Sequence, residues 1–281
     1  MKVALFATCI GDTMFPNAVA ATAKVLTRLG CDVVFPKQQT CCGQMHVNTG
    51  YQQQILPQLD TYAEAFSDPS IDYIVAPSGS CAGAVRHQHP LVAARYGTSS
   101  QEHQARACAA KTLDLSEFVI DIAGVSDVGA YFPHSVTYHS TCHSLRVLKV
   151  GDRPLKLLRA VEGIDLRPLP DATQCCGFGG TFSVKNAETS AAMVADKISN
   201  IGDTGAEFVT AGDASCLLNI EGALRRNAAP VQVLHLAEIL AATKNSPFVP
   251  ASRTPAAKAH ATKAHGAQAH GAHGHIAEVK H

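Results

Sequence analysis

Four cysteines occur twice along this chain at nearly the same spacing. The two sets are Cys9, Cys41, Cys42 and Cys81, and Cys142, Cys175, Cys176 and Cys216. Equivalent members are 133–135 residues apart, and each adjacent pair is followed by a glycine, Gly43 or Gly177. Self-similarity at a fixed period indicates a duplicated structural unit. We interpret each set of four thiols as one site, duplicated together with its unit.

The cysteine content indicates what kind of site this is. Ten cysteines in 281 residues is well below the roughly 8–10% of small disulfide-bonded domains, and a chain of this length buries a core without such links. The N-terminal MKVALFATCIGD resembles a signal peptide only up to Gly11, and cleavage after it would remove Cys9. We therefore predict a cytoplasmic protein in which the thiols serve metal or redox chemistry.

Charge and hydropathy exclude two classes of partner. The chain carries 23 basic and 23 acidic side chains and no long basic run, so nothing predicts nucleic-acid binding. No apolar stretch approaches the roughly 18 residues that a membrane-spanning helix needs. We expect neither a nucleic-acid partner nor a transmembrane segment.

Four clustered thiolates are soft ligands that suit zinc or an iron–sulfur cluster. Side chains of adjacent cysteines diverge, so the two thiols of such a pair do not readily coordinate the same small ion. A four-iron cluster presents its irons as separate corners, so each cysteine of the pair can bind a different iron. The glycine after each pair allows a positive φ and a close approach of backbone N–H groups to sulfur. The residues favour the cluster and leave zinc open.

The elements that must position these thiols alternate between strands and helices. In the first half we predict strands at 2–8, 31–35 and 71–76, with helices at 17–29 and 50–66, the second flawed by Pro57. In the second half we predict strands at 135–139, 165–169 and 207–211, with helices at 154–161 and 188–201. Residues 100–122 are predicted to be a helical connection.

This alternation predicts an α/β fold of two pseudo-symmetric, Rossmann-like halves with parallel sheets. Ligands of such sheets lie beyond the carboxyl ends of the strands, and Cys9, Cys81, Cys142 and Cys216 each follow a predicted strand. We place the first cysteine-rich domain at 1–130, the second at 131–245, and a disordered tail rich in alanine and histidine at 246–281.

The repeated order C…CCG…C resembles the cysteine-rich CCG-domain family, which includes the cysteine-rich subunit of heterodisulfide reductase and the iron–sulfur subunit of glycolate oxidase. QTCCGQMHVNTGY (39–51), YHSTCH (138–143) and QCCGFGGTFSVK (174–185) are similar to its short, stand-alone members of the lactate utilisation type. The resemblance covers roughly residues 1–243. Longer members close each repeat with C-x-x-C, whereas AGA follows Cys81 and LLN follows Cys216 here.

The resemblance implies one 4Fe–4S cluster in each half, two per chain, with all eight repeated cysteines as ligands. It also implies an electron-transfer subunit that works with other subunits of a lactate utilisation complex in oxidising L-lactate to pyruvate. The sequence contains no G-x-G-x-x-G after a strand and no Walker loop, so we assign it no catalytic residue. Two alternatives stay open, a cluster-dependent thiol–disulfide reductase subunit and a non-catalytic zinc protein.

Other candidate residues lie near the motifs. His139 and His143 flank Cys142 and are placed to donate hydrogen bonds to a cluster sulfur, or to cap a helix or face solvent. His87 and His89 are expected on a solvated helix face. Cys31 and Cys108 have no counterpart in the other half, and we assign both to packing.

Overall fold

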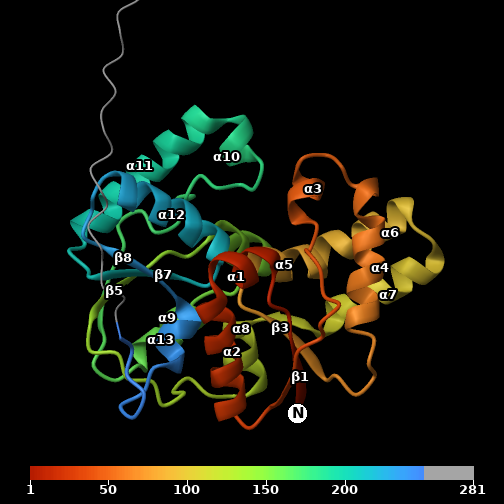
Figure 1. Ribbon diagram of the computed structural model, residues 1–281, viewed down its shortest axis with the longest axis horizontal. Helices are drawn as coiled ribbons and strands as arrows, with labels where there is room; N and C mark the ends of the chain where they lie inside the picture. The colour runs from red at the N-terminus through yellow and green to blue at the C-terminus, as the bar shows by residue number, and fades with distance from the viewer. Residues whose placement is uncertain (250–281) are drawn as a thin grey trace, which may run out of the picture. The chain divides into compact units, whose positions relative to one another are not determined.

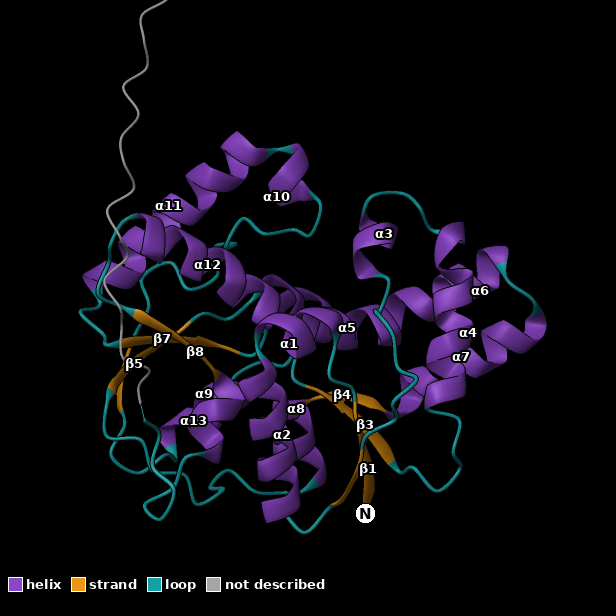
Figure 2. Ribbon diagram, in the orientation of Figure 1, coloured by secondary structure: helices purple, strands orange, loops and turns teal. Residues whose placement is uncertain are grey.

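Two parallel sheets of four strands each form the framework of the chain. The computed structural model describes residues 1–249. The first sheet has the order β2-β1-β3-β4 and is built from β1 (Lys2–Leu5), β2 (Asp32–Val34), β3 (Tyr73–Ala76) and β4 (Thr112–Asp114). The second has the order β6-β5-β7-β8 and is built from β5 (Ser135–Tyr138), β6 (Asp165–Arg167), β7 (Phe208–Ala211) and β8 (Gln232–His235). Figure 2 shows the two sheets in orange. Both have the same topology, which confirms the predicted two-half α/β fold.

Helices connect the strands in both halves. In the first half they are α1 (Cys9–Met14), α2 (Pro16–Arg28), α3 (Gln44–Asn48), η1 (Gln53–Ile55), α4 (Leu56–Ala65), α5 (Gly79–Gly83), η2 (Ala84–Gln88), α6 (His89–Tyr96), α7 (Ser99–Lys111), α8 (Leu115–Glu117) and η3 (Phe118–Ile122). In the second half they are η4 (Ser144–Leu148), α9 (Arg153–Arg159), α10 (Phe182–Lys185), α11 (Ala187–Asp203), α12 (Ala214–Arg226) and α13 (Leu236–Ala241). Figure 1 labels most of them.

Local sequence explains where the central helices begin and end. Pro16 occupies the first turn of α2, where a missing N–H is tolerated, and Gly30 follows the helix with a φ of 79°. Pro57 likewise lies in the first turn of α4. The single helix predicted over 50–66 is therefore two shorter ones, η1 and α4. Pro57 does not interrupt α4, because it lies in the first turn of that helix.

The fourth strand of each sheet was not predicted. The region predicted as one helical connection, residues 100–122, contains β4 between α7 and α8. β4 is only three residues long, and β8 has the sequence QVLH, so neither shows a clear apolar alternation. Each is a strand because a neighbour in the sheet supplies its hydrogen-bonding partners: β4 pairs with β3 and β8 with β7.

The largest apolar core lies between the two sheets and draws on both halves. It joins Val3 and Leu26 of the first half to Leu157 and Phe208 of the second. Helices α2 and α13 lie side by side there, as do α8 and α9 (Figure 1). The Arg28 guanidinium of α2 donates to three backbone carbonyls of residues 128, 240 and 241, at 2.6–2.9 Å. The halves are thus packed into one unit, and a domain boundary near residue 130 stays a prediction.

The strand order places the cysteines at a particular edge of each sheet. In the first sheet the chain leaves β1 for β2 on one side and reaches β3 on the other, which makes β1/β3 the switch point; β5/β7 is its equivalent. Open α/β sheets bind ligands in the crevice beyond the strand ends at such a point. Cys9 and Cys81 follow β1 and β3, and Cys142 and Cys216 follow β5 and β7.

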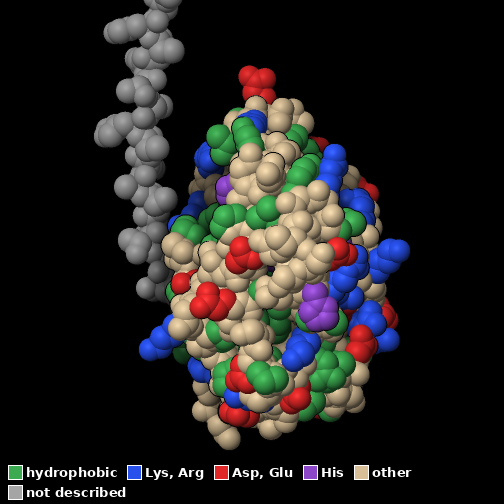
Figure 3. Space-filling view, turned by 90° about the vertical axis from the view of Figure 1, so that its right-hand side faces the viewer, with side chains coloured by type: hydrophobic (Ala, Val, Ile, Leu, Met, Phe, Trp, Pro, Cys, Tyr) green, Lys and Arg blue, Asp and Glu red, His purple; other side chains and the backbone are tan. Residues whose placement is uncertain are grey.

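The surface and the end of the described chain add three facts. Among helices within residues 1–249, none combines the length and apolar character that crossing a membrane requires. The face carrying α4, α6 and α7 shows acidic and basic side chains interspersed among uncharged ones (Figure 3).

The Phe248 ring packs against Phe132 and Phe208 at centroid distances of 5.4 and 5.7 Å. The predicted tail lies outside the described residues from position 250 onward.

Candidate metal centres

The first cysteine set converges from three separate elements. Cys9 opens α1, Cys41 and Cys42 lie in the loop after β2, and Cys81 lies in α5. The Cys9 and Cys41 Sγ atoms are 3.6 Å apart, and those of Cys42 and Cys81 are 3.3 Å apart. Residues more than 70 positions apart therefore form one thiol cluster at the carboxyl edge of the first sheet.

The second set repeats this arrangement. Cys142 contacts Cys175, and Cys176 contacts both Cys175 and Cys216 through side-chain hydrogen bonds. Burial also repeats: the first cysteine of each set and the first of each pair are half-buried, whereas the other two are buried. All ten cysteines of the chain are free thiols. The structure brings the predicted residues together four and four, and their role as ligands stays a proposal.

Backbone N–H groups point at one sulfur in each set. The Gly43 N–H donates to Cys41 Sγ at 3.5 Å, and the Gly177 N–H donates to Cys175 Sγ at 3.3 Å. Both glycines have positive φ, 74° and 83°. A Cβ at Gly177 would also lie 2.7 Å from the Ser190 carbonyl oxygen. Glycine is therefore required at this position to turn the loop over the sulfur.

Crowding of the thiols separates their pKa values in the same way in both halves. Hydrogen bonds from Cys42 and Cys9 lower the pKa of Cys41, and hydrogen bonds from Cys142 and Cys176 lower that of Cys175. Hydrogen bonds with the neighbouring cysteines of the same set, together with burial, raise the pKa of Cys42 and Cys176. One thiolate among protonated neighbours is what four close thiols allow without a counter-charge. A bound cation deprotonates coordinating thiols outright, so this donor set fits a metal or a cluster.

The carbonyl of the second cysteine in each pair is held by the helical segment that follows the fourth cysteine. His89 Nε2 lies 2.8 Å from the Cys42 carbonyl oxygen, and Asn219 Nδ2 donates to that of Cys176 at 2.7 Å. The expectation of a solvated His89 was wrong, because this side chain is buried under the loop; His87 is exposed. A polar residue at the start of an otherwise apolar helix face was the available signal.

The two centres are built at the contact between the halves. The cavity at the first set is lined by its cysteines, by Met45 and by Phe178 and Ser215 of the second half. Ser78 and Asp213, which cap the helices of Cys81 and Cys216, pair with each other, and Asp213 Oδ2 accepts from the Ser80 N–H at 2.7 Å. The first centre therefore depends on both halves for its walls.

Two ionisable side chains lie behind the second set. His139, at the end of β5, is fully buried, and its ring lies with the Cys176 and Cys216 sulfurs in a group whose ligand atoms are all within 4.8 Å of one another. It neither caps a helix nor faces solvent. His143 contacts the first half instead, with Nε2 2.8 Å from Gln44 Nε2. Lys197 of α11 is also fully buried near these thiols. Its only signal in the sequence is a lysine at an apolar helical position.

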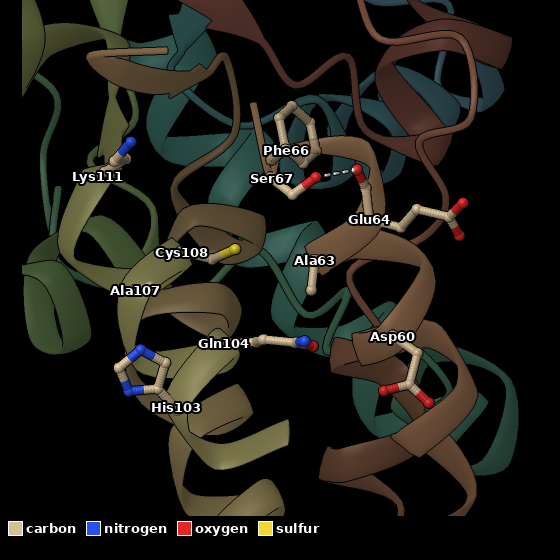
Figure 4. A pocket seen from close by; sticks show the side chains of 10 residues that line it. All are labelled: Asp60, Ala63, Glu64, Phe66, Ser67, His103, Gln104, Ala107, Cys108 and Lys111. Carbon is tan, nitrogen blue, oxygen red and sulfur yellow. Dashed lines mark hydrogen bonds between the residues drawn. The ribbon is translucent and has the colours of Figure 1, made fainter. Parts of the chain in front are cut away.

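Other cysteines and cavities lie away from the thiol clusters. Cys31 and Cys108 are buried in apolar cores, in agreement with a packing role. Burial raises the pKa of Cys108 to about 11. Cys108 lines a cavity of about 510 Å³ between α4 and α7. The side chains around that cavity do not converge on one point, and the Glu64 carboxylate turns away from it (Figure 4). It shows no arrangement suited to chemistry.

Comparison with known proteins agrees with the geometry. A family model described as a cysteine-rich domain, CCG, matches residues 3–86 and 136–221, one copy in each half. Lactate utilization protein A from Geobacillus sp. (strain WCH70) is 45% identical over 240 residues, covering 85% of this chain and 99% of that protein. The proteins of the same name from Bacillus pumilus and Exiguobacterium sp. are 45% and 44% identical, each over 85% of this chain and over 99% and 96% of their own lengths.

A solved structure of a proposed Asp/Glu racemase from Yersinia pestis superposes with a TM-score of 0.35 at 12% identity, over 85% of this chain and 95% of that one. This similarity is too remote to carry an argument. The family match in both halves and the identity to full-length relatives are specific. The chain therefore belongs to the cysteine-rich CCG-domain family, in the branch of lactate utilization protein A.

Proposed function

We propose that this chain is an iron–sulfur electron-transfer protein that holds one four-iron cluster in each half. Cys9, Cys41, Cys42 and Cys81 would bind the first, and Cys142, Cys175, Cys176 and Cys216 the second. The observation that carries the proposal is the recurrence of one thiol geometry at the switch point of both sheets. When bound, such clusters accept and release single electrons.

Three features of the protein favour a cluster over a single ion. Adjacent cysteines supply two of the four thiols in each set. Gly43 and Gly177 direct N–H groups at sulfur, and hydrogen bonds of this kind tune cluster potentials. Cys9, Cys41, Cys142 and Cys175 are only half-buried, which leaves each site an open side toward solvent and a partner.

A structural zinc site is the second candidate, and the distances between sulfurs favour it. Tetrahedral geometry with Zn–S bonds of about 2.3 Å places sulfurs about 3.8 Å apart, close to the 3.3 and 3.6 Å observed. The cavity at the first set has a volume of about 30 Å³, room for one small group. A four-iron cluster would require the thiols to spread toward the open side.

The names of the relatives support a role for this electron transfer in lactate utilisation. Proteins called lactate utilization protein A match this chain over nearly their whole lengths. We place the chain in a cytoplasmic system in which partner subunits oxidise L-lactate to pyruvate and this subunit transfers the electrons. In this proposal the cysteines serve as ligands, and the oxidation of lactate takes place on a partner.

Metal analysis distinguishes the two candidates. The full chain would be purified under strict anaerobiosis, and iron, acid-labile sulfide and zinc would be measured. We expect about eight irons and as many sulfides per chain, the content of two four-iron clusters. Two zinc ions per chain without iron would establish the structural zinc protein instead.

A turnover assay tests the place of the chain in lactate oxidation. The chain alone, its partner proteins alone and the mixture would each receive L-lactate and an artificial electron acceptor. We expect no turnover by the chain alone and a rate with the mixture that depends on this chain. Robust lactate oxidation by the isolated chain would make it the catalytic subunit and refute the proposal.

A further inference from the structure

The two thiol sets match, but the residues behind them do not. Phe6 directly follows β1, three residues before Cys9, and His139 directly follows β5, three residues before Cys142. Tyr62 of α4 and Lys197 of α11 are separated by 135 residues, the offset that relates the fourth cysteines of the two sets. Both pairs of positions are buried. The two duplicated units therefore share the four cysteines but differ in the buried side chains behind them, which we call the wall of each set.

The wall of the first set is aromatic. Phe6 and Tyr62 pack edge to face with ring centroids 5.0 Å apart, and Phe66 lies 4.5 Å from Tyr62. These rings belong to the same apolar cluster as Cys42 and Cys81. Apart from the Tyr62 hydroxyl, the three rings carry no polar atom. They offer the thiols neither a positive charge nor a ring N–H.

The wall of the second set is polar. His139 is 0% exposed, and neither of its ring nitrogens has a hydrogen-bond partner within residues 1–249. Its ring is grouped with the Cys176 and Cys216 sulfurs, all ligand atoms lying within 4.8 Å of one another. Lys197 is 0% exposed, and its Nζ donates to the Asp171 carbonyl at 2.9 Å. A buried imidazole without a partner is costly, which indicates that a group bound at Cys176 and Cys216 supplies the missing acceptor.

The His139 ring N–H and the Lys197 ammonium group would both stabilise the reduced form of a cluster bound at the second set. At least one imidazole nitrogen always carries a hydrogen, and an N–H directed at sulfur stabilises the more negative, reduced state. A buried ammonium group adds a favourable Coulomb energy that water screens only weakly. The aromatic wall of the first set supplies neither effect. His89, which lies near that wall, is not equivalent to His139, because its Nε2 contacts the Cys42 carbonyl oxygen instead of a sulfur.

We propose that the two centres are inequivalent and that His139 and Lys197 give the second centre the higher reduction potential. The proposal rests on the iron–sulfur function proposed above. With both clusters bound, an electron that entered at the first centre would pass to the second: the first would be oxidised by one electron, the second would be reduced by one, and no bond or proton would change place. An external one-electron reductant supplies that electron. The second centre is thus the electron-storing end of the chain, and His139 and Lys197 are positioning residues rather than ligands.

Redox titration of the full chain tests this. The anaerobic protein would be reduced stepwise with dithionite and mediators while the clusters are followed by electron paramagnetic resonance. We expect two separate midpoints, with the higher one lost in Cys176→Ser. His139→Phe and Lys197→Met should each change the equilibrium of the higher step at least tenfold toward the oxidised form, which is about 59 mV for one electron. The lower step should not move.

Matched variants exclude a merely structural effect. His139→Gln keeps an N–H donor and should restore most of the shift, and Phe6→His in the first half should raise the lower midpoint. Iron content and the thermal midpoint of each variant show whether it is folded and loaded. If His139→Phe does not fold, Lys197→Met and Phe6→His decide the outcome.

Two results would overturn the inference. Coincident midpoints that no variant moves would show that the walls do not tune the clusters. Loss of the second cluster's iron from folded His139→Phe would make His139 a ligand instead. Absence of iron from the unmodified chain is a different result, because it refutes the proposed function itself.

Discussion

Thr8 and Thr141 have left-handed backbone conformations directly before the first cysteine of each set, with φ of 65° and 47°. A β-branched residue is strained there, at a cost of order 1–3 kcal/mol. The Thr8 hydroxyl compensates in part by accepting from the Gly11 N–H at 3.3 Å. The same strain in both halves indicates that the turn is needed to aim Cys9 and Cys142 at their partners.

Replacement of one ligand tests whether the centres are independent. Cys42→Ser should lower iron from about eight to about four per chain and leave the spectrum of the second cluster intact, because the second set shares no thiol with the first. Cys31→Ser is the matched control, since Cys31 is also buried but lies outside both sets. Its iron content should equal that of the unmodified chain. An unchanged iron content in Cys42→Ser would remove Cys42 from the site.

A pH dependence of stability follows from His235, which caps α13. Burial lowers its pKa to about 4 from 6.5, and its Nε2 lies 3.0 Å from the Pro77 carbonyl oxygen. Between these two values the unfolded chain binds a proton that the folded chain does not. The free energy of unfolding should therefore fall as the pH falls from 6.5 to 4, by about 3 kcal/mol from this residue.

The measurement is a comparison of denaturation at several pH values. His235→Asn keeps a side chain that caps helices and should remove this part of the slope. Asp114, whose pKa burial raises to about 6, acts in the opposite direction, but it is present in both proteins and cancels in their difference. Parallel curves for the variant and the unmodified chain would show that His235 does not titrate as expected.

Among the helices, the contact between α5 and η4 joins the halves beside the thiols. α5 carries Cys81, and η4 begins two residues after Cys142. A Cβ at Gly79 would lie 2.0 Å from Ser144 Oγ and 3.2 Å from its Cβ. The φ of Gly79 is not positive, so its backbone conformation does not require glycine. Glycine is needed there because the two helices pack closely.

Gly79→Ala should therefore destabilise the protein by about 1–3 kcal/mol, the usual cost of overpacking. Gly83→Ala, in the same helix, is the control: its Cβ would meet Val147 at 3.2 Å, an exposed side chain that can turn away. Ser144→Ala should restore much of the loss in a double-mutant cycle measured by denaturant unfolding. Equal stability of the two glycine variants would contradict the close-packing argument.

For the molecule as a whole, the end of the described chain defines where it can be shortened. Phe248 packs on the second half's core, although the predicted tail begins at 246. A chain ending at residue 249 should keep its iron content, its stability and its binding to partners. A chain ending at residue 245 should lose about 1–2 kcal/mol, because it removes a partly buried phenylalanine. Thermal unfolding and iron analysis of the two truncations provide the comparison.

Equal stability of the two truncated chains would show that Phe248 adds nothing to the core. Loss of iron from the chain ending at 249 would assign residues 250–281 a role in the centres. The histidine-rich composition of that segment makes the second outcome worth measuring, since histidine binds metals.

The duplication, the fold class and the convergence of each cysteine set could be predicted from the amino-acid sequence. Side-chain chemistry and a constant period are local or repeated signals, and parallel βαβ units leave little freedom in where residues after a strand end lie. Strands β4 and β8 could not be predicted, because three or four residues acquire strand structure only from a neighbouring strand.

The environment of the thiols, in contrast, depends on the packing of the folded chain. Burial of His89 beneath the Cys42 carbonyl, the pairing of Ser78 with Asp213 and the placement of Lys197 near the second thiol set all require contacts between segments far apart in the chain. A lysine or histidine in a sequence is a solvated side chain by default. Only the packing of the helices on the sheets and of one half on the other gives these residues a buried position near the thiol sets.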